Sequence, residues 1–82
     1  MGSTILIIDD DEGLRESLSI YLEKNSFNVY QASGAEKGID IIKNNHIDLI
    51  LLDIRMPGIN GIKALKMINQ INSALNVIII TG

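Results

Sequence analysis

The fold is decided by residues 49–53, Leu-Ile-Leu-Leu-Asp, in which a continuous apolar run ends in a carboxylate. Two further runs have the same form: residues 5–8 read Ile-Leu-Ile-Ile, and residues 77–80 read Val-Ile-Ile-Ile. A strand with one face in water alternates apolar and polar residues, and none of these runs does so. The three runs therefore predict strands buried on both faces, as in a parallel sheet covered by helices.

Helical patterns occupy the segments between the strands. Each has apolar residues spaced three and four apart, which places them on one face of a helix. Residues 29–32 are interpreted as a further short strand, and the capping-box spacing of Ser33 and Glu36 predicts that the second helix starts there. The order βαβαβαβ predicts one α/β domain over residues 1–82 with a doubly wound parallel sheet. The three apolar stripes are Leu14, Leu18, Tyr21 and Leu22; Ala35, Gly38, Ile39 and Ile42; and, after Gly61, Ala64, Met67, Ile68 and Ile71.

The composition excludes several classes of protein. Hydrophobic residues make up 46% of the chain and charged residues 21%, which is typical of a folded domain. The net charge is −3 and the Lys and Arg residues are scattered, so we expect no direct binding of nucleic acid. The lack of cysteine excludes disulfides and thiolate metal sites and fits a cytoplasmic location. The apolar runs are far too short to span a membrane.

Polar side chains follow the three long apolar runs at the point where each run ends. They are Asp9, Asp10 and Asp11 after the first, Asp53 after the second and Thr81 after the third. Because the carboxyl ends of parallel strands meet at one edge of a sheet, we expect these groups to converge. Carboxylates that share a site must protonate or hold a cation, and oxygen ligands without His or Cys favour Mg²⁺. Mg²⁺ commonly binds a substrate phosphate as well, which indicates phosphoryl chemistry with Asp53 as the nucleophile.

Each of these acidic residues has an ordinary structural alternative. Asp is common as a helix N-cap and as a turn residue, and a single Asp would be explained in that way. The coincidence of acidic residues after two of the strands and a threonine after the third favours the metal site. The loop after Asp53 adds to this, because Pro57 fixes φ and Gly58 permits a sharp turn, so that the loop can present a main-chain carbonyl to the metal.

Three motifs resemble those of response-regulator receiver domains. They are the apolar run that ends in Asp9 and Asp10, the stretch Leu-Ile-Leu-Leu-Asp-Ile-Arg-Met-Pro-Gly-x-x-Gly at residues 49–61, and the ending Val-Ile-Ile-Ile-Thr-Gly at residues 77–82. The resemblance covers the whole chain and includes the spacing from the acidic pair to Asp53. It implies a flavodoxin-like fold with strand order 2-1-3-4. It also implies a signalling module, not an enzyme, that accepts a phosphoryl group from a histidine kinase or a phosphotransfer protein.

The resemblance also implies a role for each matched residue. Asp53 corresponds to the phosphoacceptor and Asp10 to the direct Mg²⁺ ligand, while Asp9 holds the ion partly through water. Asp53 and the main-chain carbonyl of Arg55 complete the protein ligands, and Thr81 corresponds to the hydroxyl that contacts the phosphoryl group.

Three other polar residues are expected to have no such role. Asp11 lies outside the matched acidic pair, and we expect it to start the first helix, where the helix dipole favours a negative charge. Arg15 is expected on the protein surface, and His46 in a surface loop.

A complete receiver continues after its fourth strand with a helix, a fifth strand that ends in a lysine, and a final helix. None of these matches a segment of residues 1–82, so we expect a truncated receiver with a partial sheet. The lysine normally binds the acceptor and the phosphoryl oxygens, so we expect phosphotransfer to be slow or absent. We also expect self-association through an uncovered fourth strand that includes Ile79, most simply as a two-fold dimer.

Two alternatives from other classes stay open at this point. The Asp-x-Asp of Asp9 and Asp11 resembles the first motif of haloacid-dehalogenase-like phosphatases, with Asp9 as the nucleophile and Asp11 as the acid/base. Gly13 stands where that family usually has a threonine, and Asp53 would have no role. The second alternative is a folding or assembly fragment whose acidic site has no function.

Overall fold

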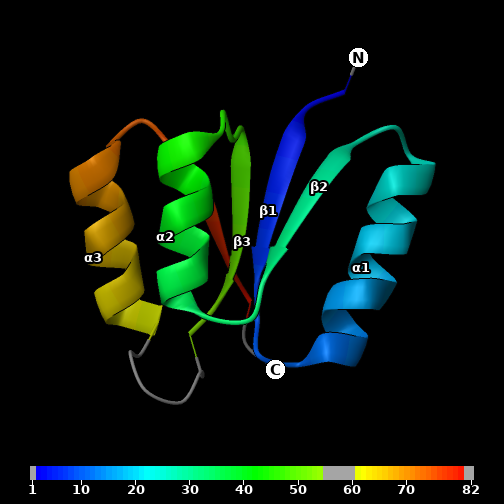
Figure 1. Ribbon diagram of the computed structural model, residues 1–82, viewed down its shortest axis with the longest axis horizontal. Helices are drawn as coiled ribbons and strands as arrows, with labels where there is room; N and C mark the ends of the chain where they lie inside the picture. Colours follow the sequence, from blue (N-terminus) through cyan, green and yellow to red (C-terminus); the bar gives the residue numbers. More distant parts are fainter. Residues whose placement is uncertain (1, 55–60, 81–82) are drawn as a thin grey trace.

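The computed structural model describes residues 2–54 and 61–80, which form one sheet and three helices (Figure 1). The elements follow one another as β1 (Thr4–Ile8), α1 (Glu12–Lys24), β2 (Asn28–Ala32), α2 (Ala35–Asn44), β3 (Leu49–Asp53), α3 (Gly61–Ile71) and β4 (Asn76–Ile80). The predicted order βαβαβαβ is confirmed, and each predicted strand is lengthened by one residue. None of the described helices is long and apolar enough to span a membrane.

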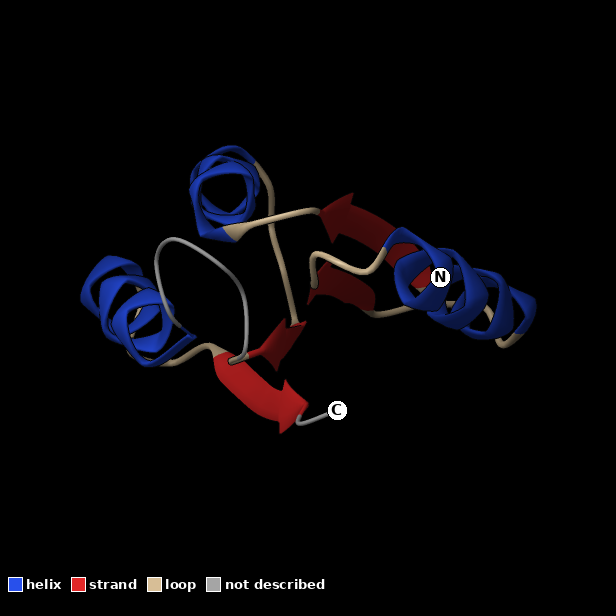
Figure 2. Ribbon diagram, turned by 90° about the horizontal axis from the view of Figure 1, so that it is seen from below, coloured by secondary structure: helices blue, strands red, loops and turns tan. Residues whose placement is uncertain are grey.

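All strand pairs in the sheet are parallel, and the strand order is β2-β1-β3-β4. Helix α1 lies on one face of the sheet, and α2 and α3 lie on the other (Figure 2). The predicted doubly wound α/β fold and the predicted strand order are therefore confirmed. Because β1 and β3 are neighbours, with Ile8 paired to Leu52, the residues that end these strands are brought side by side.

The main hydrophobic core joins the sheet to α2 and α3. Its buried residues are Leu6, Ile8, Ala32, Ala35, Ile42, Ile47, Ile50, Leu52, Ala64 and Ile68. The stripe predicted for α2 is buried as expected. Gly38 in this stripe allows the helix to approach β1 closely, since a Cβ atom there would lie 2.5 Å from Cδ1 of Ile8.

The burial of the strands differs from the prediction in an informative way. Of the four strands that the structure describes, β1 alone is buried on both faces. In β3, burial alternates, with Ile50 and Leu52 buried and the residues between them half-buried. In β4, Ile78 is 52% exposed and Ile79 is 42% exposed. In the described part of the chain β4 is an edge strand, and this accounts for its exposure.

Two details predicted for the helices are wrong. In α1, Tyr21 is 65% exposed, and the buried residue of the helix is Ser19, because the face that meets the sheet is rotated away from the apolar stripe. Helix α2 begins after Gly34, which has an extended backbone and no side chain to cap the helix, so Ser33 is not the N-cap. The apolar pattern thus predicted the position of each helix in the chain correctly, but it did not predict which face of α1 packs against the sheet.

Asp48 joins the starts of β1 and β3, at the end of the sheet opposite Asp9 and Asp53. Its Oδ2 accepts the Thr4 backbone N–H at 2.7 Å, and its Oδ1 lies 2.8 Å from Nε2 of His46, which is exposed as predicted. Hydrogen bonds to an ionised carboxylate favour the charged form. The Thr4 amide, followed by His46, therefore lowers the pKa of Asp48 below its ordinary value of 3.8.

Replacing Asp48 with Asn should lower the stability of the fold at neutral pH and matter progressively less in acid. Because the folded-state pKa lies below 3.8, the carboxylate stabilises the fold above that pH, and the contribution is lost as the pH falls through the folded-state pKa. The urea midpoints of wild type and Asp48→Asn should therefore converge below pH 3.8. Asp40→Asn, on the exposed surface of α2, is the control. A difference that stayed constant over this range would contradict the assignment.

Candidate metal and phosphoryl-acceptor site

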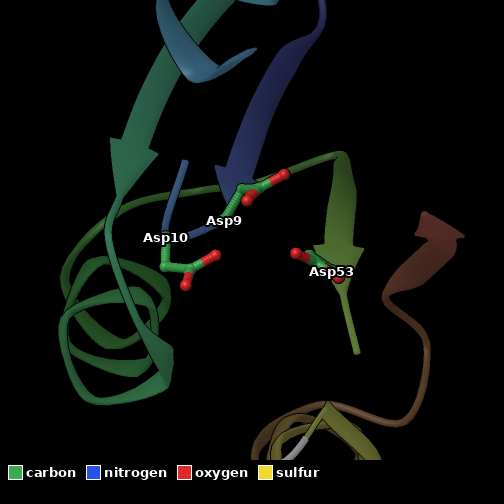
Figure 3. A group of neighbouring side chains, drawn as sticks. All are labelled: Asp9, Asp10 and Asp53. Carbon is green, nitrogen blue, oxygen red and sulfur yellow. The ribbon is translucent and has the colours of Figure 1, made fainter. Parts of the chain in front are cut away.

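Three carboxylates meet at the carboxyl end of the sheet. Asp9 and Asp10 directly follow β1, and Asp53 is the last residue of the neighbouring strand β3. One carboxylate oxygen from each of the three lies within 4.8 Å of the others. The side chains gather around one space at the ends of the two strands (Figure 3). The structure thus brings these three predicted residues together, and we call them the acidic cluster.

The acidic cluster is buried on one side and open on the other. Asp9 is only 1% exposed, Asp53 is half-buried and Asp10 is exposed. A cation in the cluster would therefore contact a buried carboxylate on one side, that of Asp9, and would be open to solvent on the side of Asp10.

Hydrogen bonds in the connection between β1 and α1 fix the backbone that carries the acidic cluster. The Asp9 N–H donates to the Ala32 carbonyl at 3.1 Å, which extends the pairing of β1 with β2 by one residue. Oδ1 of Asp9 accepts the Asp11 N–H at 2.9 Å, and Oδ1 of Asp11 accepts the Leu14 N–H at 3.1 Å. Asp11 is the N-cap of α1, so the expectation that it starts this helix is confirmed.

The electrostatics of the acidic cluster disfavour three simultaneous negative charges. Burial is the largest cause that raises the pKa of Asp9 above its ordinary value, and the negative charges of Asp53 and Asp10 act in the same direction. A hydrogen bond between the Asp9 and Asp53 carboxyls also raises this pKa, because it requires a proton on one of them. The Asp11 N–H donated to Asp9 opposes these effects. A divalent cation would remove the repulsion without a proton.

The ligand chemistry of the acidic cluster suits a hard cation. All donors are carboxylate oxygens, and no histidine or cysteine belongs to the set. Mg²⁺ prefers oxygen ligands, keeps several bound waters and usually takes only one or two protein carboxylates. A cluster of three carboxylates that is open to solvent on one side provides such ligands and leaves room for the waters. The residues present therefore fit the predicted ion.

Two of the predicted site residues, Arg55 and Thr81, lie outside the described residues. A further residue at the site was predicted wrongly. Arg15, which we expected at the surface, is half-buried, and its Nη1 donates a hydrogen bond to the main-chain carbonyl of Asp9 at 2.7 Å. No sequence pattern marks a side chain that reaches back to the main chain six residues earlier, and the contact therefore appears only in the structure.

Comparison with known proteins identifies the family. Residues 5–82 match the response regulator receiver domain, and the chain belongs to this family. A curated relative is the sporulation initiation phosphotransferase F of Bacillus subtilis, which is 37% identical over 82 residues. The alignment covers 100% of this chain and 66% of the relative, so the chain spans just under two thirds of that protein's length.

Solved structures show the same fold. A CheY-like receiver domain protein from Methanospirillum hungatei superposes with a TM-score of 0.95 at 30% identity, over 100% of this chain and 66% of that one. The response regulator TrrA from Thermotoga maritima, solved in complex with Mg(2+)-BeF, superposes with a TM-score of 0.90 at 29% identity, over 96% and 69% of the two chains. A structure of the histidine kinase ThkA in complex with TrrA matches as well, with a TM-score of 0.91 at 29% identity over 98% and 69%. The chain is thus a receiver-type module of two-component signalling.

Proposed function

We propose that this chain accepts a phosphoryl group on Asp53 in a reaction that depends on Mg²⁺ held by the acidic cluster. The observation that carries the proposal is the convergence of three carboxylates within 4.8 Å at the ends of two parallel strands. The donor is a phosphohistidine on a histidine kinase or a phosphotransfer protein. The similarity to a response regulator solved in complex with a histidine kinase supports this choice of partner. With this partner, we propose a cytoplasmic location for the chain.

The proposed reaction is a single displacement at phosphorus. A carboxylate oxygen of Asp53 attacks the phosphorus, the new P–O bond forms as the P–N bond of the phosphohistidine breaks, and the imidazole keeps the electron pair and takes up a proton. The phosphoryl group remains on the chain, so the chain acts as an acceptor module and not as an enzyme that releases a product.

In this proposal, the residues of the site have different roles in binding Mg²⁺ and the phosphoryl group. Asp10 and Asp53 ligate Mg²⁺ directly, and Asp9 holds it partly through water. When bound, Mg²⁺ neutralises charge on the transferred phosphoryl oxygens. We propose the main-chain carbonyl of Arg55 as a further ligand and the Thr81 hydroxyl as the group that contacts the phosphoryl oxygens afterwards.

A titration with Mg²⁺ followed by NMR tests the metal site. The amide signals of Asp10, Asp11 and Asp53 should shift together, because Asp10 and Asp53 belong to the acidic cluster and Asp11 directly follows Asp10 in the chain. Asp53→Asn should weaken Mg²⁺ binding by at least about tenfold, since even an indirect partner of a metal ligand is typically worth that much. Asp40→Asn changes the net charge equally at a remote surface and should bind like wild type. Shifts confined to residues away from the strand ends would overturn the metal site.

The phosphatase alternative loses its support in the structure. It needs Asp11 as an acid/base, whereas Oδ1 of Asp11 accepts the Leu14 N–H as the cap of α1. It also leaves Asp53 without a role, although Asp53 is a member of the acidic cluster. The family match and the acidic cluster together favour the receiver function over a fragment without function.

We also propose that this polypeptide associates with a second copy through the edge of β4. Residues 77–80 carry no charge and no proline, and Ile78 and Ile79 are 52% and 42% exposed. An uncharged apolar edge strand is a template for pairing with another chain, and an edge-to-edge pair of two identical strands can close as a two-fold dimer. Association would bury the exposed isoleucine side chains.

Light scattering across a dilution series tests this association. Wild type should show a mass that falls on dilution, and Ile79→Lys should remain monomeric, because a charge on the edge strand blocks pairing. Ile62→Lys is the matched control, since Ile62 is similarly exposed, at 51%, but lies on α3. A monomeric wild type at high concentration, or equal effects of the two substitutions, would contradict the proposal.

A further inference from the structure

Arg15 connects α1 to the backbone of the acidic cluster. Its backbone N–H donates to the Asp11 carbonyl at 3.0 Å as part of the first helical turn. Its side chain turns back, and Nη1 donates to the Asp9 carbonyl at 2.7 Å. This carbonyl belongs to the peptide group that joins Asp9 to Asp10, so one guanidinium holds the peptide that carries two of the three carboxylates.

Arg15 is half-buried, and one nitrogen of its guanidinium group is enclosed by the protein. Its Nε is screened from solvent and has no hydrogen-bond partner among the described residues. Ser19, one helical turn later, has a buried Oγ in the same condition. Burying polar atoms without partners costs free energy, and such groups often serve a purpose other than stability. The hydrogen bond from Arg15 to the Asp9 carbonyl suggests what this purpose is, because it acts on the backbone that carries the acidic cluster.

The other hydrogen bonds of Asp9 involve groups outside the peptide that joins it to Asp10. The Asp9 N–H is bound to Ala32, and Oδ1 of Asp9 accepts the Asp11 N–H. The carbonyl of this peptide, which directly precedes Asp10, accepts a hydrogen bond from Nη1 of Arg15. Rotation of this peptide would change the direction of both neighbouring side chains, because they leave the chain on either side of it.

We propose that Arg15 is a positioning residue for the metal site: by holding the Asp9 carbonyl, it orients the carboxylates of Asp9 and Asp10 toward the ion. The proposal rests on the proposed function in that it assumes Mg²⁺ binding by the acidic cluster. Groups that orient metal ligands commonly contribute about 10- to 100-fold to metal affinity. We place Arg15 at the lower end of this range, since hydrogen bonds to Ala32 and from Asp11 also hold Asp9.

The charge of Arg15 has an effect opposite to that of its hydrogen bond. A cation close to the site repels Mg²⁺, so removal of the charge alone would tighten binding. Arg15→Lys keeps the charge, while its ammonium lies one bond closer to the backbone and lacks the fork of the guanidinium. Arg15→Gln removes the charge and the contact together. The two variants therefore separate orientation from charge.

The test is a Mg²⁺ titration of wild type, Arg15→Lys and Arg15→Gln, followed by NMR. Before Mg²⁺ is added, the ¹⁵N signal of Asp10, which belongs to the peptide held by Arg15, should move in both variants. Arg15→Lys should then bind Mg²⁺ about tenfold more weakly than wild type, and Arg15→Gln should lose less affinity because the repulsion is also gone. Lys24→Gln, at the other end of α1, controls for a change of charge and should bind like wild type.

The outcomes are distinct. Arg15→Lys with wild-type affinity, or Arg15→Gln with higher affinity than wild type, would show that Arg15 acts only through its charge and would overturn the proposal. A loss of folding stability with unchanged Mg²⁺ affinity of the folded chain would assign a purely structural role and would overturn it as well. If wild type itself did not bind Mg²⁺ at the acidic cluster, the proposed function would fail, and the role of Arg15 with it.

Discussion

Asp53→Asn should reduce the uptake of a phosphoryl group from acetyl phosphate to background. Asp53 supplies the attacking oxygen, and an amide at that position is far less nucleophilic than a carboxylate and does not form a stable acyl phosphate. The measurement is the mass of the intact protein after prolonged incubation with acetyl phosphate and Mg²⁺, which registers even slow uptake.

Asp48→Asn is the matched control for this loss. Asp48 also lies beside the sheet, but its carboxylate binds the Thr4 amide at the end opposite the acidic cluster. This variant should take up the phosphoryl group like wild type as long as it remains folded. Uptake by Asp53→Asn at the rate of wild type would show that another residue is the acceptor.

Ile68→Ala should destabilise the fold by about 2 to 5 kcal/mol, the usual cost of removing a large aliphatic side chain from a core. Ile68 of α3 is 0% exposed and packs in the core between the sheet and the helices. Small domains have only about 5 kcal/mol or somewhat more to lose, so this single change should leave a substantial unfolded population. Urea unfolding followed by circular dichroism measures the change.

Ile62→Ala is the control in the same helix. Ile62 is 51% exposed and lies in the same helix, so the same substitution at the two positions compares an exposed isoleucine with a buried one. We expect Ile62→Ala to change the stability by no more than about 0.5 kcal/mol. Equal losses in the two variants would mean that α3 does not pack against the sheet as described.

The strand pattern predicted the fold because it depends on local features. Continuous apolar runs that alternate with helical stripes allow few arrangements other than a parallel sheet with helices on both faces. The same logic led from strand ends to the acidic cluster, since neighbouring parallel strands necessarily bring Asp9 and Asp53 to one edge. The assignment of Asp11 to the helix start succeeded for the same local reason.

The burial of particular side chains was harder to predict because it depends on what lies across the sheet. An isoleucine in β4 has the same sequence pattern as one in β1, yet Ile78 is 52% exposed while Ile7 is fully buried, because β1 has neighbours on both sides and helices on both faces. Likewise, apolar spacing placed Tyr21 on the packed side of α1, whereas the helix turns Ser19 toward the protein interior.

The role of Arg15 was missed because its contact is made to a main-chain atom. Sequence patterns register side-chain chemistry and periodicity, and a carbonyl oxygen has the same chemistry at every residue. The burial of polar atoms in Arg15 and Ser19 could not be predicted either, because a helical pattern does not show which polar residues of the helix are buried.

The most direct test of the central claim is to locate the phosphorylated carboxylate. After incubation with acetyl phosphate, borohydride reduces an aspartyl phosphate to homoserine, and mass spectrometry of peptides identifies the converted residue. The proposed function predicts conversion of Asp53 alone, and only when Mg²⁺ is present. Conversion of Asp9, or conversion of Asp53 that proceeds equally well without Mg²⁺, would contradict it.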